Sequence, residues 1–204
     1  MHFDFLIEDK SGKIMLEHLI PKIIDIQEHS FKVKPYEGIG RLPKNLATPK
    51  EIRHQALLND LPRALKAYGK THKGYGVDYP VCLFVICDLD ARCQRKFREE
   101  LSRILNQCSS PPRTQFCIAV EEGEAWLLGD VEAIMNAYPK AKSSIIKGYI
   151  NDSICGTWEV LEKALGTKNK SEWAKNITPY MQVENNKSPS FQYFVSKVRD
   201  YSNE

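Results

Sequence analysis

The longest apolar run in the chain covers residues 81–87 and stops at Asp88, Leu89 and Asp90. A continuous run of this length between polar residues predicts a strand that is buried on both faces of a parallel sheet. If the extended geometry continues, residues two apart point to the same side, and we expect the carboxylates of Asp88 and Asp90 to face one point in space. Shorter apolar runs predict further strands at residues 3–7, 31–33 and 115–120.

Helical spacing of apolar residues predicts three helices between these strands, at residues 14–26, 50–68 and 93–105. Pro21 marks a kink or a restart of the first helix, and Pro62 is a candidate interruption of the second. Asp130 is the expected N-cap of a helical region, with segments at residues 131–137, 158–165, 172–181 and 191–198. Residues 37–49 and 69–80 are expected to be loops, and residues 138–156 have no clear pattern.

Strands that alternate with helices predict an α/β fold with a parallel sheet flanked by helices. Right-handed crossovers bring the carboxyl ends of such strands to one edge, where ligands bind. We expect this α/β core to cover residues 1–130. Residues 131–204 are expected to form a helical extension packed on the core.

The composition is that of one globular chain: 204 residues, 42% hydrophobic and 27% charged. A net charge of +3 permits binding to a polyanion without predicting it. The N-terminus has no apolar stretch of signal-peptide length, and no segment approaches the roughly 20 apolar residues of a membrane span. We therefore expect a cytoplasmic protein with no membrane partner. The six cysteines form no C-x-x-C pair and are expected to be reduced and buried.

Three of the predicted strands end in carboxylates. Glu8 follows the first, Asp88 and Asp90 follow the central one, and Glu122 and Glu124 follow the last. Magnesium binds one or two carboxylates and leaves its other positions to water and phosphate, so this edge is a candidate metal site. The alternative is that Asp88 and Asp90 only cap the next helix. Other catalytic motifs are missing: residues 69–71 end like a phosphate-binding loop but lack its first glycine, and neither H-E-x-x-H nor G-x-S-x-G occurs.

A glutamate that ends the first strand and an Asp-x-Asp that ends a central strand resemble the Toprim fold of topoisomerases, primases and nucleases of the overcoming-lysogenisation-defect (OLD) type. The chain is most similar to uncharacterised prokaryotic Toprim-like proteins related to OLD nucleases. Their E-x-E-A-W-L-L-x-D segment corresponds to residues 122–130, and their C-terminal pattern to residues 185–191. One departure is that related nucleases have glycine directly after the first glutamate and a second acid a few residues on, where this chain has Asp9 and Gly12.

The resemblance implies metal-dependent cleavage of phosphodiester bonds in nucleic acid, with Mg²⁺ or Mn²⁺ as cofactor and water as nucleophile. It further implies an ATPase partner, in genome defence or DNA processing. The implied roles are metal ligands for Asp88 and Asp90, a ligand or general base for Glu8, second-site ligands for Glu122 and Glu124, and phosphate binding for Arg92 and Lys13.

Two other functions stay open. One alternative to the nuclease is a non-catalytic interaction subunit of an ATPase complex that keeps the scaffold and its acids. The other is a D-x-D phosphatase. In such phosphatases the motif normally lies near the N-terminus and is followed by Thr or Val, whereas Ala91 and Arg92 follow it here. Among neighbouring residues, we expect Glu121 to be solvated and Trp126 to lie in a helix core.

Overall fold

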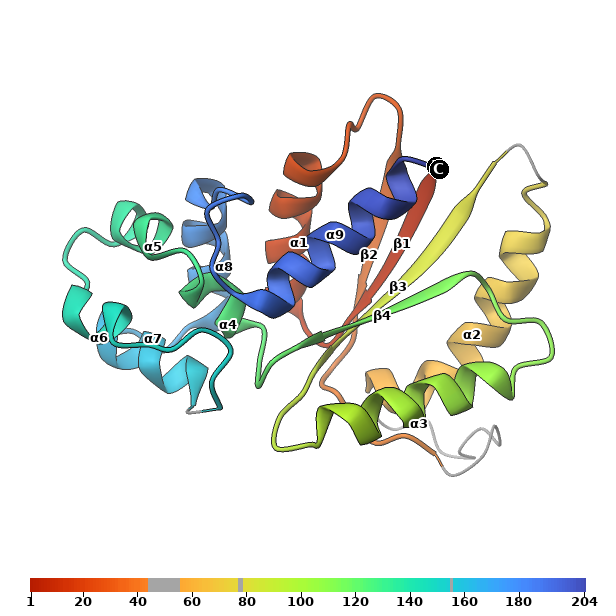
Figure 1. Cartoon of the computed structure of the whole chain (residues 1–204), viewed down its shortest axis with the longest axis horizontal. Helices are drawn as coiled ribbons and strands as arrows, with labels where there is room; N and C mark the ends of the chain where they lie inside the picture. Colours follow the sequence, from red (N-terminus) through yellow and green to blue (C-terminus); the bar gives the residue numbers. More distant parts are fainter. Residues whose placement is uncertain (44–55, 77–78, 155) are drawn as a thin grey trace. The chain divides into compact units, whose positions relative to one another are not determined.

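The computed structural model describes residues 1–43, 56–76, 79–154 and 156–204. It shows the predicted α/β fold: a four-stranded parallel sheet, flanked by helices and followed by C-terminal helices (Figure 1). The strands are β1 His2–Ile7, β2 Ser30–Pro35, β3 Val81–Asp88 and β4 Thr114–Ala119, in the order β2-β1-β3-β4. The register pairs Ile7 of β1 with Pro35 of β2 and with Ile86 of β3.

The helices begin with α1 Lys10–Ile23, α2 Leu57–Lys73 and α3 Gln94–Asn106, which alternate with the strands. After β4 come α4 Glu124–Leu128, α5 Val131–Ala137, α6 Ser143–Lys147, α7 Thr157–Leu165, α8 Lys170–Ile177, the 3-10 helix η1 Thr178–Tyr180 and α9 Pro189–Ser202. No helix in the described ranges combines the length and the apolar character that a membrane crossing needs.

The residues cluster into two compact units that interleave along the chain. Unit 1 comprises residues 1–10, 26–87 and 92–117, and unit 2 comprises residues 11–25, 88–91 and 118–204. The predicted boundary at residue 130 divides the chain into two contiguous domains, and it stays a prediction.

Unit 1 contains most of the sheet, with α2 and α3 lying side by side against it (Figure 1). Its centre is aromatic: the Phe84 ring lies 5.9 Å from the Phe3 ring and 5.3 Å from the Phe5 ring, and all three side chains are buried. β3 is buried along its whole apolar run, as predicted for a central strand.

Unit 2 is built from most of α1 and all helices after β4. The Trp126 ring of α4 stacks on Phe194 of α9 at 5.0 Å and meets Phe191 edge-on at 5.5 Å. The Lys22 ammonium at the end of α1 donates to the carbonyls of Thr178 and Met181, both at 2.9 Å. These charge-assisted hydrogen bonds fasten α1 to η1 and the residue that follows it.

The predicted boundaries were wrong where a tertiary contact decides them. The second helix was expected to end near residue 68, but α2 continues through Gly69 to Lys73. A Cβ at Gly69 would lie 1.9 Å from the Ser110 carbonyl oxygen, so this glycine permits close packing and does not break the helix. Pro21 lies inside α1 without a restart, and Pro62 lies inside α2. The predicted start of the second helix lies outside the described residues.

A stretch without an assignment contains a helix, and one expectation about the cysteines was wrong. Residues 138–156 had no assignment, yet they contain α6. Cysteines 82, 87, 108 and 117 form no disulfide and are buried, as predicted, but Cys93 is exposed because it precedes α3, whose buried face begins at Phe97. Cys155 lies outside the described residues.

Candidate functional site

Asp88 and Asp90 lie where β3 ends and the chain turns. The strand stops at Asp88, and Asp90 has a left-handed backbone with φ of 49°, so the extended geometry that was expected to align the two side chains does not continue. The Leu89 N–H donates to the Ala119 carbonyl at 2.9 Å, and the Asp90 N–H donates to the Glu121 carbonyl at 2.8 Å. These bonds hold the Asp-Leu-Asp segment against the acidic segment that follows β4.

The Asp88 carboxylate faces the start of α4. A Cβ at Gly123 would lie 3.9 Å from Asp88 Oδ1, which is ordinary van der Waals contact. Gly123 stands between Glu122 and Glu124, so the structure brings three of the predicted ligands into one region of unit 2.

Lys170, the first residue of α8, is the functional candidate that sequence reasoning missed. Its Nζ lies 3.1 Å from Glu124 Oε2 and 3.5 Å from Glu122 Oε1. The Glu124 side chain is only 7% exposed, the Glu122 side chain 21% and the Lys170 side chain 37%. The Thr157 hydroxyl donates to the other oxygen of Glu122 at 3.3 Å. A basic residue thus neutralises both predicted second-site ligands.

The pKa values of this group follow from burial and charge. Burial raises the pKa of Glu124 above its usual range, and the charge of Lys170 opposes this rise. Burial alone would lower the pKa of Lys170, but the negative charges of Glu124, Glu122 and Asp88 outweigh it, so that the pKa of Lys170 is raised. Lys170 therefore carries its positive charge at neutral pH, and this charge also interacts with the carboxylate of Asp88.

The arrangement of these carboxylates limits which metal sites the protein can form. Within the part of the chain that the structure describes, no group of three or more His, Cys, Asp or Glu side chains is arranged to hold a metal ion. A cage of protein ligands alone is therefore not formed there. Magnesium needs only one or two carboxylates when water and phosphate complete its shell, so the metal-ligand roles of Asp88 and Asp90 stay predictions. Glu122 and Glu124 do not fit a second ion while they pair with Lys170.

The other predicted site residues are Glu8, Arg92 and Lys13, and each has its own local contacts. Glu8, in unit 1, directly follows β1, and its carbonyl accepts the Gly38 N–H at 3.0 Å. Arg92, also in unit 1, places its guanidinium 5.1 Å from the centre of the Phe97 ring. Lys13, on α1, pairs with Glu17 at 3.5 Å. The roles predicted for these three residues stay predictions.

Glu121 was expected to be solvated, and this expectation was wrong. Its two carboxylate oxygens accept the backbone N–H groups of Gly156 at 2.7 Å and Thr157 at 2.9 Å. These donors open α7, whose first N–H groups have no partner within the helix. Glu121 therefore caps α7.

The segment at residues 122–130 is fastened to the segment at residues 185–191. The Asn186 side chain donates to the Trp126 carbonyl at 2.7 Å, and the Trp126 indole N–H donates to the Ser190 hydroxyl at 3.0 Å. A Cβ at Gly129 would lie 2.1 Å from Asn186 Oδ1, so only glycine permits this approach. Trp126 is fully buried, as predicted, and Asp130 is confirmed as an N-cap that accepts the Ala133 N–H at 3.0 Å.

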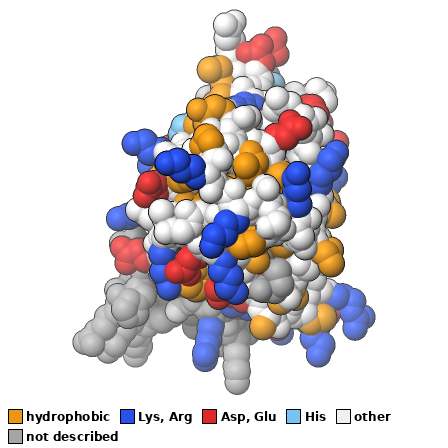
Figure 2. Space-filling model, turned by 90° about the vertical axis from the view of Figure 1, so that its left-hand side faces the viewer, with side chains coloured by type: hydrophobic (Ala, Val, Ile, Leu, Met, Phe, Trp, Pro, Cys, Tyr) orange, Lys and Arg blue, Asp and Glu red, His pale blue; other side chains and the backbone are white. Residues whose placement is uncertain are grey.

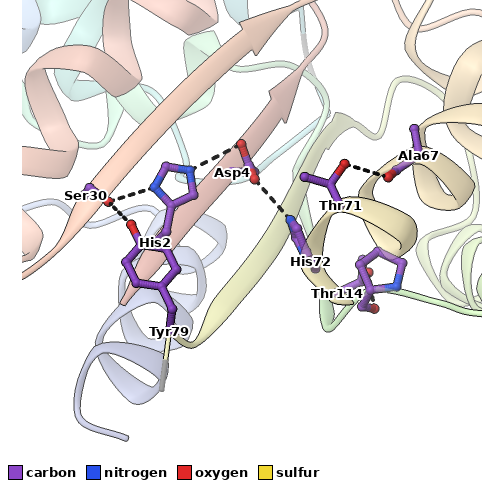
Figure 3. A network of polar contacts seen from close by, with 9 residues as sticks. His2, Asp4, Ser30, Ala67, Thr71, His72, Tyr79 and Thr114 are labelled. Atoms are coloured by element: carbon purple, nitrogen blue, oxygen red, sulfur yellow. Dashed lines mark hydrogen bonds and ion pairs between the residues drawn. The ribbon is translucent and has the colours of Figure 1, made fainter. Parts of the chain in front are cut away.

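A second polar cluster lies in unit 1, around the buried Asp4 of β1 (Figure 3). His72 Nε2 lies 3.1 Å from one Asp4 oxygen, and His2 Nε2 lies 3.5 Å from the other. His2 Nδ1 is 2.8 Å from the hydroxyl of Ser30, which is 3.2 Å from the Tyr79 hydroxyl. The cluster joins β1 to β2 and α2, and it was not predictable because the histidines are scattered along the chain.

Comparison with known proteins gives a family but no activity. No curated protein and no solved structure matches the chain. One family model matches residues 7–199, which include both acidic segments and Lys170. The chain belongs to the family described as Domain of unknown function (DUF4276).

Proposed function

We propose that the protein hydrolyses phosphodiester bonds in nucleic acid with the help of Mg²⁺ or Mn²⁺. The observation that carries this proposal is the end of β3, where backbone hydrogen bonds hold the Asp88–Asp90 segment beside the acids that follow β4. A divalent ion at such carboxylates supplies positive charge to a phosphate and lowers the pKa of bound water. The resemblance to Toprim-fold and OLD-type nucleases supports the same chemistry.

In this proposal Asp88 and Asp90 hold the metal, and Glu8 is a further ligand or the general base. Glu122 and Glu124 were predicted to bind a second metal. Because Lys170 already pairs with both, we propose a single metal ion, with the Lys170 ammonium as the second positive charge near the phosphate. Arg92 and Lys13 are the proposed phosphate contacts.

An ATPase partner is part of the proposal. Toprim nucleases of the resembling type are often paired with an ATPase, and the sequence has no intact phosphate-binding loop of its own. The isolated chain is then expected to cleave weakly, and full-rate cleavage without ATP would contradict the partner.

A non-catalytic subunit of an ATPase complex is the second candidate. The observation in its favour is that Lys170 neutralises Glu122 and Glu124 without any metal. The two functions differ in metal affinity, because an interaction subunit needs no ion at Asp88 and Asp90.

The deciding experiment incubates the purified chain with plasmid, single-stranded DNA or RNA, in manganese or in chelator. The parent is compared with Asp88→Asn/Asp90→Asn and with Glu132→Gln, a control at an exposed acid of α5. We expect manganese-dependent cleavage by the parent and the control, and none by the double variant. Equal cleavage by all three would identify a contaminant, and absence of manganese binding in calorimetry would favour the interaction subunit.

A further inference from the structure

A basic groove runs along the exposed side of α3, in unit 1. It is shallow, with a volume of about 600 Å³, and its lining residues recur at helical spacing. They are Arg95, Arg98, Glu99, Ser102, Arg103, Asn106 and Gln107.

The segment around this groove is basic. Residues 92–107 contain five basic and two acidic residues, a net charge of +3. α3 itself contributes four basic and two acidic residues to this sum. The groove therefore lies in a basic part of a chain whose formal net charge is only +3.

The fold keeps this charge on the surface. α3 buries Phe97, Leu101 and Ile104, which turns the opposite stripe toward solvent. Within the described residues, neither Arg95 nor Arg103 forms an ion pair. Their guanidinium groups are available for a ligand, beside the side-chain amides of the groove.

The spacing suits a phosphate backbone. Eight residues of helix separate Arg95 from Arg103, a rise of about 12 Å. One strand of DNA carries a phosphate every ~3.4 Å along its axis, so this length spans about three or four phosphates. Arginine binds phosphate in a bidentate manner, and amides and hydroxyls are common additional phosphate donors.

We infer that the α3 groove binds the phosphate backbone of nucleic acid. The choice of nucleic acid over other polyanions rests on the proposed function. An acidic polypeptide is the other polyanion that such arginines could bind, and it is one outcome of the test.

The test measures the binding of labelled single-stranded DNA and of its duplex by fluorescence anisotropy, in chelator and over about 50 to 200 mM salt. The parent is compared with a triple variant, Arg95→Gln, Arg98→Gln and Arg103→Gln. If each arginine neutralises one phosphate, the slope of log Kobs against log salt shrinks by about 2 for the single strand and about 2.7 for the duplex.

Two matched triples serve as controls. Lysine at the same three positions keeps the charge and should keep the slope. Glutamine at Lys140, Lys142 and Lys147 removes the same charge from exposed positions of unit 2, on the side that carries α5, α6 and α7. Figure 2 shows that basic side chains there are spread among acidic and hydrophobic ones, so this triple should also keep the slope.

An unchanged slope in the arginine-to-glutamine triple, or an equal loss in the lysine control, overturns the inference. So does groove-dependent binding of polyglutamate that is as tight as DNA binding, which would assign the groove to an acidic polypeptide. Binding is measured in chelator and cleavage is measured separately in manganese. DNA binding through the groove together with no cleavage in manganese supports the groove and refutes the nuclease. Manganese-dependent cleavage together with an unchanged slope in the arginine-to-glutamine triple supports the nuclease and refutes the groove.

Discussion

Replacing Lys170 by methionine tests the organisation of the acidic site. Methionine has an unbranched side chain of similar volume to that of lysine but carries no charge. The substitution therefore removes the partner of Glu124 and Glu122 with little change in packing. The two carboxylates, 3.1 and 3.5 Å from Lys170 Nζ, are then left close together without a cation.

The expected loss of stability follows from burial. Breaking a fully buried ion pair costs about 3 to 5 kcal/mol, because an uncompensated charge remains inside the protein. Glu124 is nearly that buried at 7% exposure, but Lys170 is 37% exposed, and solvent screens its part of the pair. We therefore expect Lys170→Met to lower the free energy of unfolding by about 1 to 3 kcal/mol at neutral pH.

The loss should depend on pH in a defined direction. Burial already raises the pKa of Glu124, and removal of Lys170 raises it further. A carboxyl whose pKa is higher in the folded state binds its proton more tightly there. It therefore does not lower the free energy of unfolding below the unfolded-state pKa, and it lowers that free energy increasingly as pH rises through the folded-state pKa. The penalty of Lys170→Met should therefore be small near the unfolded value of 4.5 and largest at neutral pH.

Urea denaturation at several pH values, from about 4.5 to about 7.5, measures this. Lys175→Met, an exposed position on the same helix, is the control and should change stability by less than about 0.5 kcal/mol at every pH. A penalty for Lys170→Met that equals the control, or that does not change with pH, would refute the coupling between Lys170 and Glu124.

Three other substitutions test the remaining assignments. Asp88→Asn/Asp90→Asn should abolish manganese binding in calorimetry while the metal-free melting temperature holds or rises, because mutual repulsion is relieved; a drop of several degrees would instead indicate a capping role. Asn186→Ala should cost about 2 to 4 kcal/mol in urea denaturation, because it leaves the Trp126 carbonyl and the Ser188 N–H without their partner, and Asn185→Ala is the exposed control. Asp4→Asn should cost about 1 to 3 kcal/mol through its bond to His72, and an unchanged midpoint would contradict the buried cluster.

The sequence was sufficient for the features that depend on local pattern. The apolar run of β3 is long enough to identify a central strand, and the carboxyl-edge rule then places the acids. The end of that strand was not predictable, because a hydrogen bond from Asp90 to a residue beyond β4 sets it. Gly69 was misjudged for the same reason: its role depends on Ser110, which is distant in sequence.

Partners that are distant in sequence gave no signal at all. Lys170 is 46 residues from Glu124, and His72 is 68 residues from Asp4. Nothing in the local pattern distinguishes Lys170 from other lysines at the start of a helix. A single sequence can therefore suggest the acids of a site, but the residue that balances their charge emerges only from the fold.

The segment at residues 122–130 shows why a motif can mislead about function. Glu122 and Glu124 turn to Lys170, and these are the members that bear on chemistry. Trp126 and Asp130 turn the other way: the Trp126 carbonyl accepts from Asn186, and Asp130 Oδ2 accepts the Gln182 N–H at 2.9 Å. Because the two parts of this segment have different partners, substitutions at Glu122 and Glu124 should alter the charge balance around Lys170, and those at Trp126 should alter packing and stability. The motif as a whole therefore indicates a scaffold that carries a site, and the charge balance around Lys170 decides what that site can bind.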